Sequence, residues 1–423
     1  MCGFCGFFIK KKTDNQFISN LNLLNEMSES IKHRGPDGHG QWYNEDKRVF
    51  LDHRRLSILD LSNKATQPMS SNNERWTIIF NGEIYNYLEL KNKISEEKNL
   101  QSNYWKSSGD TEVLVNLIDM YGIEEALNLI EGMFSFVIWD NVENEIILAR
   151  DRLGEKPLYF SQDENFLVFS SDIIAIKKFY KEELTLDINS VRELIKYNYI
   201  PSPNTIYQKI KKLEAGTYIK INSDLETLKI KKYWNLFNFH KNEHKKLDIE
   251  KIPHDVEKLL IPILKKEIIS DVPVGIYLSG GVDSTLLASL LSFKTEAKLK
   301  SFTIKNEDNN FDESEIAKKT SKMLNLEHHE FIVNKNDLLD LIDQLSSVYT
   351  EPFADSSQLP TLLLNHKAKD FIKVAIGGDG GDELFGGYNR YVYMDKYYPL
   401  LNNIPIKIRD HLSKILLGFN AKT

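Results

Sequence analysis

The sequence predicts two domains of different architecture: an α+β domain of sheets flanked by helices, followed by an α/β domain built on a doubly wound parallel sheet. The 423 residues suffice for two or three domains of ordinary size, and 41% hydrophobic residues can fill their cores. Short β-type runs joined by polar turns dominate the first half, which predicts antiparallel hairpins. Strands and helices alternate in the second half, which predicts parallel strands with right-handed crossovers.

The first domain, residues 1–222, is expected to combine strands with a few helices. Runs rich in β-branched and aromatic residues predict the strands Phe4–Ile9, Arg75–Phe80, Met133–Trp139, Glu145–Ala149 and Phe166–Ser170. Apolar residues at helical spacing predict helices over Ser19–Lys32 and Asp110–Tyr121. The short polar turn Asp140–Asn144 joins two of the strands and favours an antiparallel pair.

A polar linker, residues 223–253, is expected next, because His240–Pro253 is highly charged and has no clear apolar period. The second domain, residues 254–423, then alternates. Its predicted strands are Val272–Leu278, Leu299–Ile304, His329–Val333 and Phe371–Ile376. Its predicted helices are Thr285–Phe293, Glu313–Leu324, Asp337–Tyr349 and Gln358–Lys369. A sheet of this kind binds ligands at the carboxyl ends of its strands.

Composition and charge argue against several classes of protein. No apolar run approaches the roughly 20 residues of a membrane-spanning helix. The first residues, MCGFCGFFIKKK, have their basic cluster after the apolar run, which is the reverse of a secretory signal. A net charge of -7 disfavours binding to nucleic acid, and two cysteines cannot build a disulfide framework. We therefore expect a cytoplasmic protein with no nucleic-acid or membrane partner.

Two Gly-rich stretches follow predicted strands of the second domain. They are Ser279-Gly280-Gly281-Val282-Asp283-Ser284 and the run GGDGGDE at 377–383. Glycine N–H groups, the hydroxyls of Ser279 and Ser284 and the start of a helix can together bind phosphate oxygens. Carboxylates repel phosphate, so Asp283 and Asp382 are expected to bind a magnesium ion that bridges the phosphates.

These stretches match neither of two common nucleotide motifs. No Lys follows the paired glycines as in a Walker A loop, and the third glycine of the dinucleotide fingerprint is missing. The alternative is a pair of turn loops with acidic caps. Two such stretches at strand ends of one alternating unit favour the phosphate site.

Cys2 becomes the first residue once Met1 is removed, and an N-terminal cysteine carries its own base. Its α-amine, with a pKa of about 8, can take the thiol proton directly or through water. Cys2 and Cys5 also form a C-x-x-C pair, but no histidine is spaced to complete a zinc site and no βαβ unit follows. Taken alone, Cys2 could equally be a core residue. On a strand the two side chains point to opposite faces, so Cys5 is expected to be a small buried hydrophobe.

A series of motifs runs through the first half. In order they are MCGF, HRGPDGHG (His33–Gly40), HRRLSILDL (His53–Leu61), FNGEIYN (Phe80–Asn86), SGDTEVL (Ser108–Leu114) and RDRLGEKPLY (Arg150–Tyr159). They resemble those of the glutamine amidotransferases with an N-terminal cysteine. The resemblance implies an αββα sandwich of the Ntn-hydrolase type, with Cys2 as the nucleophile that attacks glutamine.

The same resemblance implies roles for further residues. Arg55 would bind the α-carboxylate of glutamine, a task suited to a guanidinium, and Asp110 its α-ammonium group. Asn81 and the Gly82 N–H would form the oxyanion hole, and Glu83 would also contact the amine. His33 and Arg34 are expected to be structural or to gate a loop.

Each of these residues also has a purely structural interpretation. Arg55 could be a surface charge. Asp110 could be a helix N-cap, and Asn81-Gly82 could be a hairpin turn. Their joint occurrence in family order favours the glutaminase interpretation.

In the second half, SGGVDS resembles the PP-loop of ATP pyrophosphatases. The stretch GGDGGDELFGGYNRY resembles the matching region of the glutamine-dependent asparagine synthetases. The resemblance implies that the ATP site is formed by Leu278, Ser279, Gly280, Gly281, Asp283, Ser284, Ile304, Gly377 and Gly378. Asp379 stands where many members carry a Glu that is important for forming the acyl-adenylate, and the shorter acid keeps the charge.

The two halves together imply a glutamine-dependent amide synthesis. We expect glutamine, aspartate and ATP as substrates, Mg2+ as cofactor and a homodimer as the assembly. Family members usually continue well beyond the GGY region, whereas about 36 residues follow Gly387 here. Two alternatives stay open: the amidation of a sugar acid for surface polysaccharide, and a truncated chain that retains only glutaminase activity or nucleotide binding.

Overall fold

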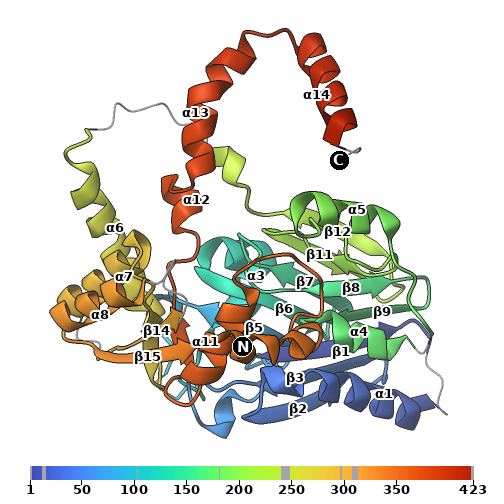
Figure 1. Cartoon of the computed structure of the whole chain (residues 1–423). Coiled ribbons are helices and arrows are strands. Elements are labelled where there is room, and N and C mark those ends of the chain that lie inside the picture. Colours follow the sequence, from blue (N-terminus) through green and yellow to red (C-terminus); the bar gives the residue numbers. More distant parts are fainter. Residues whose placement is uncertain are drawn as a thin grey trace.

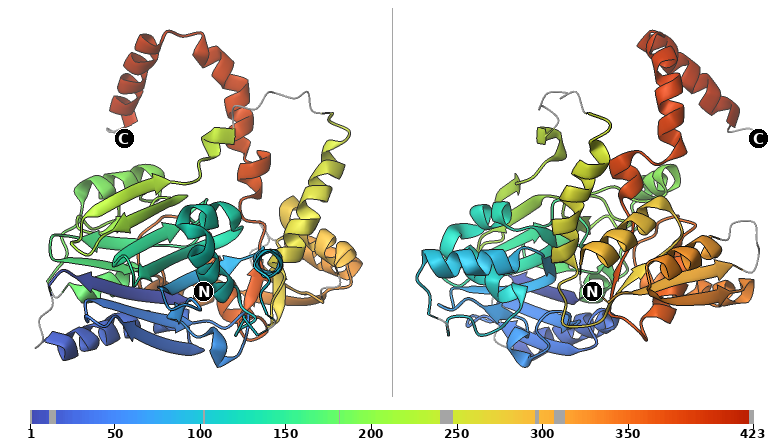
Figure 2. Two further views of the ribbon diagram at one scale, coloured as in Figure 1. Left: turned by 180° about the vertical axis from the view of Figure 1, so that it is seen from behind. Right: turned by 90° about the vertical axis from the view of Figure 1, so that its left-hand side faces the viewer.

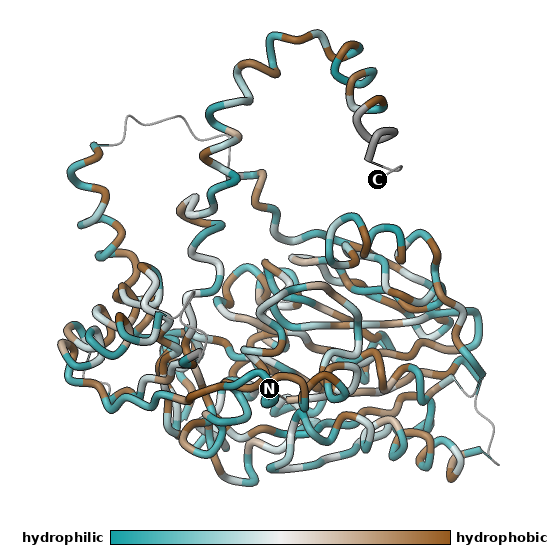
Figure 3. The backbone as a smooth tube through the Cα atoms, in the orientation of Figure 1, coloured by the Kyte–Doolittle hydropathy of each residue, from teal (hydrophilic) through white to brown (hydrophobic). Residues whose placement is uncertain are grey.

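In the computed structural model, the first half of the chain forms two sheets packed face to face, and the second half forms a separate parallel sheet beside them (Figure 1). The structure describes residues 2–11, 16–101, 103–180, 182–239, 248–295, 298–306 and 313–420. The apolar residues concentrate along the strands, where they form the cores between the layers (Figure 3).

The first sheet has the strand order β10-β8-β9-β1-β3-β2, and its paired strands are antiparallel. Its strands are β1 (Gly3–Ile9), β2 (Gly38–Tyr43), β3 (Val49–Arg55), β8 (Tyr159–Gln162), β9 (Phe166–Ser170) and β10 (Lys211–Lys212). Side chains of β1 alternate between its two faces. Phe4 and Phe8 face the second sheet, whereas Cys5 and Phe7 pack under helices on the outer face. Cys5 is fully buried there, which confirms the expectation for this residue.

The second sheet has the order β12-β11-β7-β6-β5-β4 and is also antiparallel. Its strands are β4 (Met69–Ser70), β5 (Trp76–Ile84), β6 (Gly132–Asp140), β7 (Glu145–Arg150), β11 (Thr217–Ile221) and β12 (Thr227–Lys232). Strand β12 lies in the stretch where we expected a linker, so the sheet extends beyond residue 222 to Lys232. Residues 240–247 of that expected linker lie outside the described residues.

Helices cover both outer faces of this pair of sheets. Helices α1 (Phe17–Ser30) and α4 (Ile173–Phe179) pack on the first sheet, and α2 (Tyr87–Glu97) and α3 (Asp110–Leu129) pack on the second. Between the sheets, Phe8 meets Trp139 edge to face with ring centroids 5.5 Å apart. Helix α5 (Ile188–Tyr197) follows α4. The arrangement confirms the predicted αββα sandwich.

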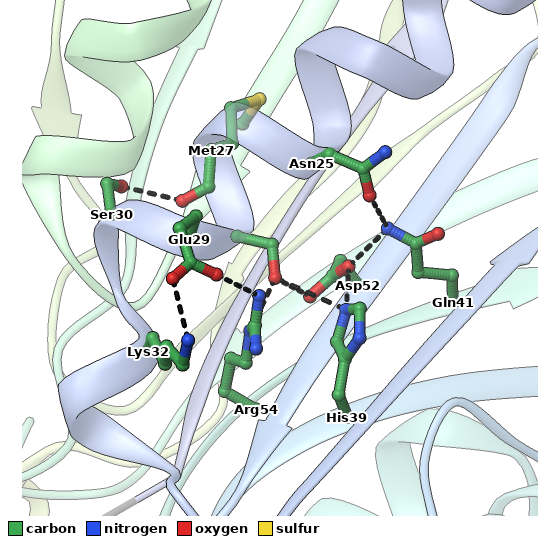
Figure 4. Close-up of polar contacts among 10 residues, drawn as sticks. Asn25, Met27, Glu29, Ser30, Lys32, His39, Gln41, Asp52 and Arg54 are labelled. Carbon is green, nitrogen blue, oxygen red and sulfur yellow. Dashed lines mark hydrogen bonds and ion pairs between the residues drawn. The ribbon is translucent and has the colours of Figure 1, made fainter.

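A polar cluster fastens α1 to the edge of the first sheet (Figure 4). The buried carboxylate of Asp52 on β3 accepts hydrogen bonds from His39 Nε2 and Gln41 Nε2, each at 2.8 Å, and from the Ser28 hydroxyl. Arg54 Nε donates to the Ser28 hydroxyl at 2.7 Å. These contacts hold the end of β3 in place. Arg55, the last residue of that strand, directly follows Arg54.

The third sheet is parallel, with the order β15-β14-β13-β16. Its strands are β13 (Val274–Tyr277), β14 (Lys300–Asn306), β15 (Glu327–Val333) and β16 (Val374–Ile376). Helices α6 (Ile252–Glu267), α7 (Val282–Lys294) and α8 (Ser314–Met323) share a core on one face, and α11 (Gln358–Ala368) packs on the other. The predicted doubly wound α/β domain is confirmed.

One predicted helix of this domain is wrong. The segment Asp337–Tyr349 was expected to form a single helix, but it is broken into α9 (Lys335–Leu339), a 3-10 turn at Ile342–Gln344 and α10 (Leu345–Val348). Short helices of this kind leave most of their side chains at least partly exposed. Leu341 is an exception, because its side chain is buried.

The last described helices project away from the rest of the molecule (Figures 1 and 2). They are α13 (Asn389–Asn402) and α14 (Ile406–Asn420), which follow the short helix α12 (Gly381–Phe385). Helix α13 has no buried residue, and its Tyr393, Met394 and Leu400 are more than half exposed. Among the described residues, no helix combines the length and apolarity that a membrane span requires.

Candidate active site

A cavity of about 320 Å3 lies where the first domain meets the second. Residues of β3, β5 and α3 line it from the first domain, and residues at the start of β16 line it from the second. All the first-domain candidates contribute to its wall: Cys2, Arg55, Asn81, Gly82, Glu83 and Asp110. Folding therefore brings together residues that are widely separated in the sequence.

Cys2 precedes β1 and is half-buried in this wall. Its sulfur accepts a hydrogen bond from the Leu56 N–H at 3.3 Å and lies 3.6 Å from the Leu56 carbonyl oxygen. Arg34 Nε donates to the Cys2 carbonyl oxygen at 3.2 Å, so Arg34 holds the backbone of the candidate nucleophile. Burial raises the pKa of the thiol, so a base must remove its proton at neutral pH.

No histidine in the described part of the chain is placed to supply that base. Within the described residues, no histidine lines the cavity. His53 is fully buried on β3, where its Nε2 donates to the Phe80 carbonyl oxygen at 3.0 Å. Burial lowers its pKa to about 4, which keeps it neutral. The predicted base is the α-amine of Cys2, which depends on removal of Met1, a residue that lies outside the described residues.

Arg55 is 7% exposed, so its interpretation as a surface charge is wrong. Its guanidinium donates to the carbonyl oxygens of Leu59 at 3.3 Å, Asp60 and Ser62 at 2.8 Å. These carbonyl oxygens orient the guanidinium. They carry no formal charge, so they do not neutralise it. A full positive charge therefore lies at the cavity wall, where it can bind a carboxylate.

Asn81 and Gly82 lie inside strand β5, so the alternative of a hairpin turn is wrong. Both polar atoms of the Asn81 side chain are buried and have no hydrogen-bond partner in the protein. Buried polar atoms of this kind cost free energy unless something binds them. Since Asn81 lines the cavity, its side chain can donate to an oxygen of a bound substrate.

Two carboxylates lie in the same cavity. Asp110 is the first residue of α3, and its Oδ2 accepts a hydrogen bond from the Ile84 N–H at 3.0 Å. The cap of this helix is Gly109, so the interpretation of Asp110 as the N-cap is wrong. Burial raises the pKa of Asp110 to about 6. Burial, with Asp110 nearby, raises the pKa of Glu83 to about 7. Such a pair favours a bound cation.

Several residues of the cavity were not predicted. Lys156 is buried beside Glu83, and its position in the RDRLGEKPLY motif could have revealed it. Gln67 accepts a hydrogen bond from the Phe80 N–H at 2.7 Å and supports β5 from within. Lys373, Val374 and Ala375 come from the second domain. No local pattern could indicate them, because their place in the wall depends on how the domains dock.

The predicted phosphate loops meet at a second place. Strands β13 and β16 are neighbours, while β14 and β15 continue on the other side of β13, so the strand order reverses between β13 and β16. Ligands bind open α/β sheets at such a point. SGGVDS follows β13 and GGDGGDE follows β16. A Cβ built on Gly378 would lie 3.2 Å from the Cβ of Asp283, so the two loops are in contact.

The SGGVDS loop has the features of a phosphate-binding loop. Gly280 has a φ of +84°, which an L-residue with a side chain rarely adopts. The hydroxyls of Ser279 and Ser284 are 3.1 Å apart, and α7 begins two residues after Gly280 with its N–H groups unpaired in the first turn. Leu278 is buried behind the loop.

The other predicted ATP residues surround this loop. Ile304 lies on the neighbouring strand β14, and Gly377 and Gly378 follow β16. Asp379 is exposed at the mouth of the second loop.

The two touching loops carry the carboxylates that could hold a magnesium ion. Within the described residues, no three His, Cys, Asp or Glu side chains come together as in a metal site made by protein alone. Asp283 and Asp382 lie on the two touching loops, and both are partly exposed. Mg2+ ordinarily takes only one or two carboxylates and completes its shell with water and phosphate oxygens. The pair therefore fits an ion that arrives with a nucleotide.

Comparisons with known proteins agree with this division into two sites. Residues 1–234 match the family described as glutamine amidotransferase domain, and residues 255–421 match the family described as asparagine synthase. A protein of Methanocaldococcus jannaschii, provisionally named glutamine-hydrolyzing asparagine synthetase 2, is 37% identical over 86% of this chain. Glutamine-hydrolyzing asparagine synthetase 1 of Bacillus subtilis is 33% identical over 92%.

The chain spans 72% of the length of the Methanocaldococcus protein and 59% of that of the Bacillus protein. Among solved structures, the glutamine phosphoribosylpyrophosphate amidotransferase of Bacillus subtilis shares 17% sequence identity. That match covers 81% of this chain and 70% of the other, with a TM-score of 0.40. The sequence relatives carry the assignment: the chain belongs to the family of glutamine-hydrolysing asparagine synthetases.

Proposed function

We propose that this chain makes asparagine from aspartate, glutamine and ATP, with glutamate, AMP and pyrophosphate as the other products. One observation carries the glutaminase half of this proposal. A half-buried thiol, an unpartnered Asn81 side chain, a buried guanidinium and two buried carboxylates share one cavity. This set matches the polar groups of glutamine one by one.

Glutamine would bind with its amino-acid end between charges of opposite sign. The Arg55 guanidinium would pair with the α-carboxylate, and Asp110 and Glu83 would hold the α-ammonium group. The side-chain amide then reaches toward Cys2. Its carbonyl oxygen would lie between the Asn81 side chain and the Gly82 N–H.

The first reaction releases ammonia. The neutral α-amine of Cys2 takes the thiol proton, and the sulfur attacks the amide carbon of glutamine. Asn81 and Gly82 stabilise the oxyanion, an effect that ordinarily lowers a barrier by about 3 kcal/mol per donor. The carbon–nitrogen bond breaks, the nitrogen receives the proton and leaves as ammonia, and a thioester remains. Water then hydrolyses the thioester to glutamate and restores the thiol.

The second reaction would take place at the loops that follow β13 and β16. The side-chain carboxylate of aspartate attacks the α-phosphorus of ATP, and pyrophosphate leaves. The backbone of 279–281 and the start of α7 would bind the phosphates. Bound Mg2+, held by Asp283 and Asp382, would neutralise charge on the pyrophosphate. Asp379 would assist formation of the acyl-adenylate.

Ammonia then attacks the acyl carbon, and AMP leaves. Ammonia that reached bulk water would be protonated and would no longer be a nucleophile, so we propose that it passes between the sites without leaving the protein. We also propose that the enzyme works in the cytoplasm as a homodimer. Both described cysteines are free, as is usual in a reducing compartment.

A pair of variants tests the division into two sites. We expect Cys2→Ala to abolish glutamate release from glutamine, while pyrophosphate release with aspartate, ATP and ammonium salt persists. We expect Asp283→Ala to abolish pyrophosphate release with either nitrogen source and to leave glutamate release measurable. Cys5→Ala is the control, because Cys5 packs under α1 away from the cavity and its variant should retain both activities.

Two results would contradict the proposal. Loss of ammonia-dependent turnover in Cys2→Ala would show that the sites are not separate. Pyrophosphate release with a sugar acid in place of aspartate would show that the acceptor is wrong.

A further inference from the structure

The loop after Arg55 connects the glutamine cavity to the second domain. This segment, Leu56–Ser62, is called the Arg55 loop here, because three of its carbonyl oxygens hold the Arg55 guanidinium. At its start, the Leu56 N–H donates to the Cys2 sulfur. The loop thus contacts both the candidate nucleophile and the group proposed to bind the glutamine carboxylate.

One residue of the second domain, Asp271, forms two hydrogen bonds with this loop. Asp271 Oδ2 accepts a hydrogen bond from the Asp60 N–H at 2.7 Å, and the Asp271 N–H donates to the Ile58 carbonyl oxygen at 3.0 Å. Close by, Asp37 Oδ2 accepts from the Ser57 N–H at 2.9 Å and pairs with Lys373 of the second domain at 2.8 Å. The loop is therefore held from the domain boundary along most of its length.

The loop has a conformation that needs such support. Asp60 has a φ of +54°, a left-handed conformation that costs free energy in a residue with a side chain. Its own carboxylate is occupied within the first domain, where it accepts from Ser62 and from the Ser108 N–H at 2.7 Å. Among the residues that the structure describes, the hydrogen-bond acceptor of the Asp60 N–H is Asp271, across the domain boundary. Since the Asp60 carbonyl oxygen holds Arg55, any relaxation at Asp60 would move the guanidinium.

We propose that Asp271 is a positioning residue for glutamine: it fixes the Arg55 loop from the second domain and so orients the guanidinium that binds the α-carboxylate. The inference rests on the proposed function, because it takes Arg55 as the carboxylate site. Asp271 lies three residues before β13, the strand that ends at the SGGVDS loop. The segment that holds the Arg55 loop therefore leads directly into the strand that carries the proposed phosphate loop.

Covalent labelling of Cys2 provides a test that does not depend on complete turnover. One probe is a glutamine-shaped diazoketone, in which a diazomethyl ketone replaces the side-chain amide and the α-carboxylate is kept. The other is iodoacetamide, which has no carboxylate. We expect Asp271→Ala to weaken the apparent affinity for the diazoketone about tenfold, as for loss of a hydrogen bond that orients a charged group. Labelling by iodoacetamide should change by less than about twofold.

Two further variants show whether the effect is specific. Asp271→Asn keeps an oxygen that can accept from the Asp60 N–H, so it should restore most of the affinity. Lys266→Met removes another contact between the domains, the pairs of Lys266 with Glu89 and Glu131, which lie away from the Arg55 loop. It should label like the parent chain. In steady state, Asp271→Ala should raise KM for glutamine and leave kcat for glutamate release nearly unchanged.

The outcomes separate the inference from the function on which it rests. If the parent chain does not react with the diazoketone at Cys2, the proposed glutaminase is wrong. If the parent reacts and Asp271→Ala reacts equally well, the role of Asp271 is wrong. It is also wrong if Lys266→Met shows the same loss, or if iodoacetamide labelling slows to the same extent, because docking or folding in general would then be the cause.

Discussion

At the scale of single residues, the ionisation of Glu83 predicts that the proposed binding of glutamine depends on pH. Burial and the neighbouring Asp110 raise the pKa of Glu83 to about 7, so its carboxyl group is mostly neutral near pH 6 and mostly ionised near pH 8. Only the ionised form attracts the α-ammonium group of glutamine. We therefore expect KM for glutamine to fall as the pH rises through about 7. Steady-state glutaminase assays across this range measure it.

Glu83→Gln is the control for this dependence. The amide does not titrate, so the change in KM near pH 7 should disappear. The remaining change should lie near pH 6, because burial raises the pKa of Asp110 to about 6 and that residue is intact. An unchanged KM profile in Glu83→Gln would show that another group controls binding.

The residues of the glutamine cavity differ in how far the sequence could predict them. Cys2, Arg55 and Asp110 each lie in a contiguous motif, so neighbouring residues identify them. Lys156 lies in such a motif as well, but a buried lysine beside Glu83 becomes meaningful only when the fold brings them together. Asp271 lies on the other domain. Its contact with the Arg55 loop depends on docking, which leaves no local pattern in the sequence.

At the scale of elements, strand β5 depends on the absence of a side chain at Gly82. A Cβ at this position would clash with the Met133 carbonyl oxygen on β6, the neighbouring strand. We expect Gly82→Ala to shift β5 away from β6, to lower the midpoint of thermal unfolding and to reduce glutamate release by at least about tenfold, because Asn81 and the position 82 N–H move together. Calorimetry and the glutaminase assay measure the two effects.

Gly109→Ala is a matched control for this prediction. Gly109 lines the same cavity, but its φ of -82° suits any residue. A Cβ there would lie 3.7 Å from the Cβ of Asp60 and 3.8 Å from that of Ala65, which are ordinary contacts. Its unfolding midpoint should stay close to that of the parent chain. A similar midpoint in Gly82→Ala would contradict the argument from the strand.

The predicted elements were those whose own residues determine them. Strands such as β6 and β9 are apolar and aromatic, and both were predicted within a residue or two of their ends. Two of the strands that were missed have other compositions. Strand β2 reads GHGQWY, and β12 reads TLKIKK with mostly exposed side chains. Both form strands because they pair with a neighbouring strand. The residue pattern of one segment contains no information about that neighbour.

At the scale of the whole molecule, the two proposed sites lie at opposite ends of the same two strands. Residues at the start of β16 line the glutamine cavity, and the GGDGGDE loop follows its last residue. Asp271 precedes β13, and the SGGVDS loop follows it. Strands β13 and β16, which are neighbours in the parallel sheet, therefore separate the two proposed sites by little more than their own length. On the proposed function, ammonia released in the glutamine cavity would have only this short distance to travel to the phosphate loops.

The projecting helices are expected to unfold locally more easily than the packed domains. Since α13 buries none of its residues, few contacts oppose its local unfolding, and a protease needs a locally unfolded segment. We expect a protease that cuts after aromatic residues to cleave this 423-residue chain first between Tyr388 and Tyr398. Mass spectrometry of the early fragments identifies the sites.

The exposure of tyrosine side chains alone would not predict this order of cleavage, because two tyrosines outside α13 are similarly exposed. Tyr43 on β2 is 43% exposed and Tyr199 after α5 is 56% exposed, similar to the 46% of Tyr397 on α13. Both belong to the packed first domain, where cleavage requires a larger part of the structure to open, so they should be cut later. If Tyr199 were cut first and α13 became more resistant at higher protein concentration, a second copy of the chain would cover α13. Equal rates at all these tyrosines would instead show that α13 is no easier to unfold than the sandwich.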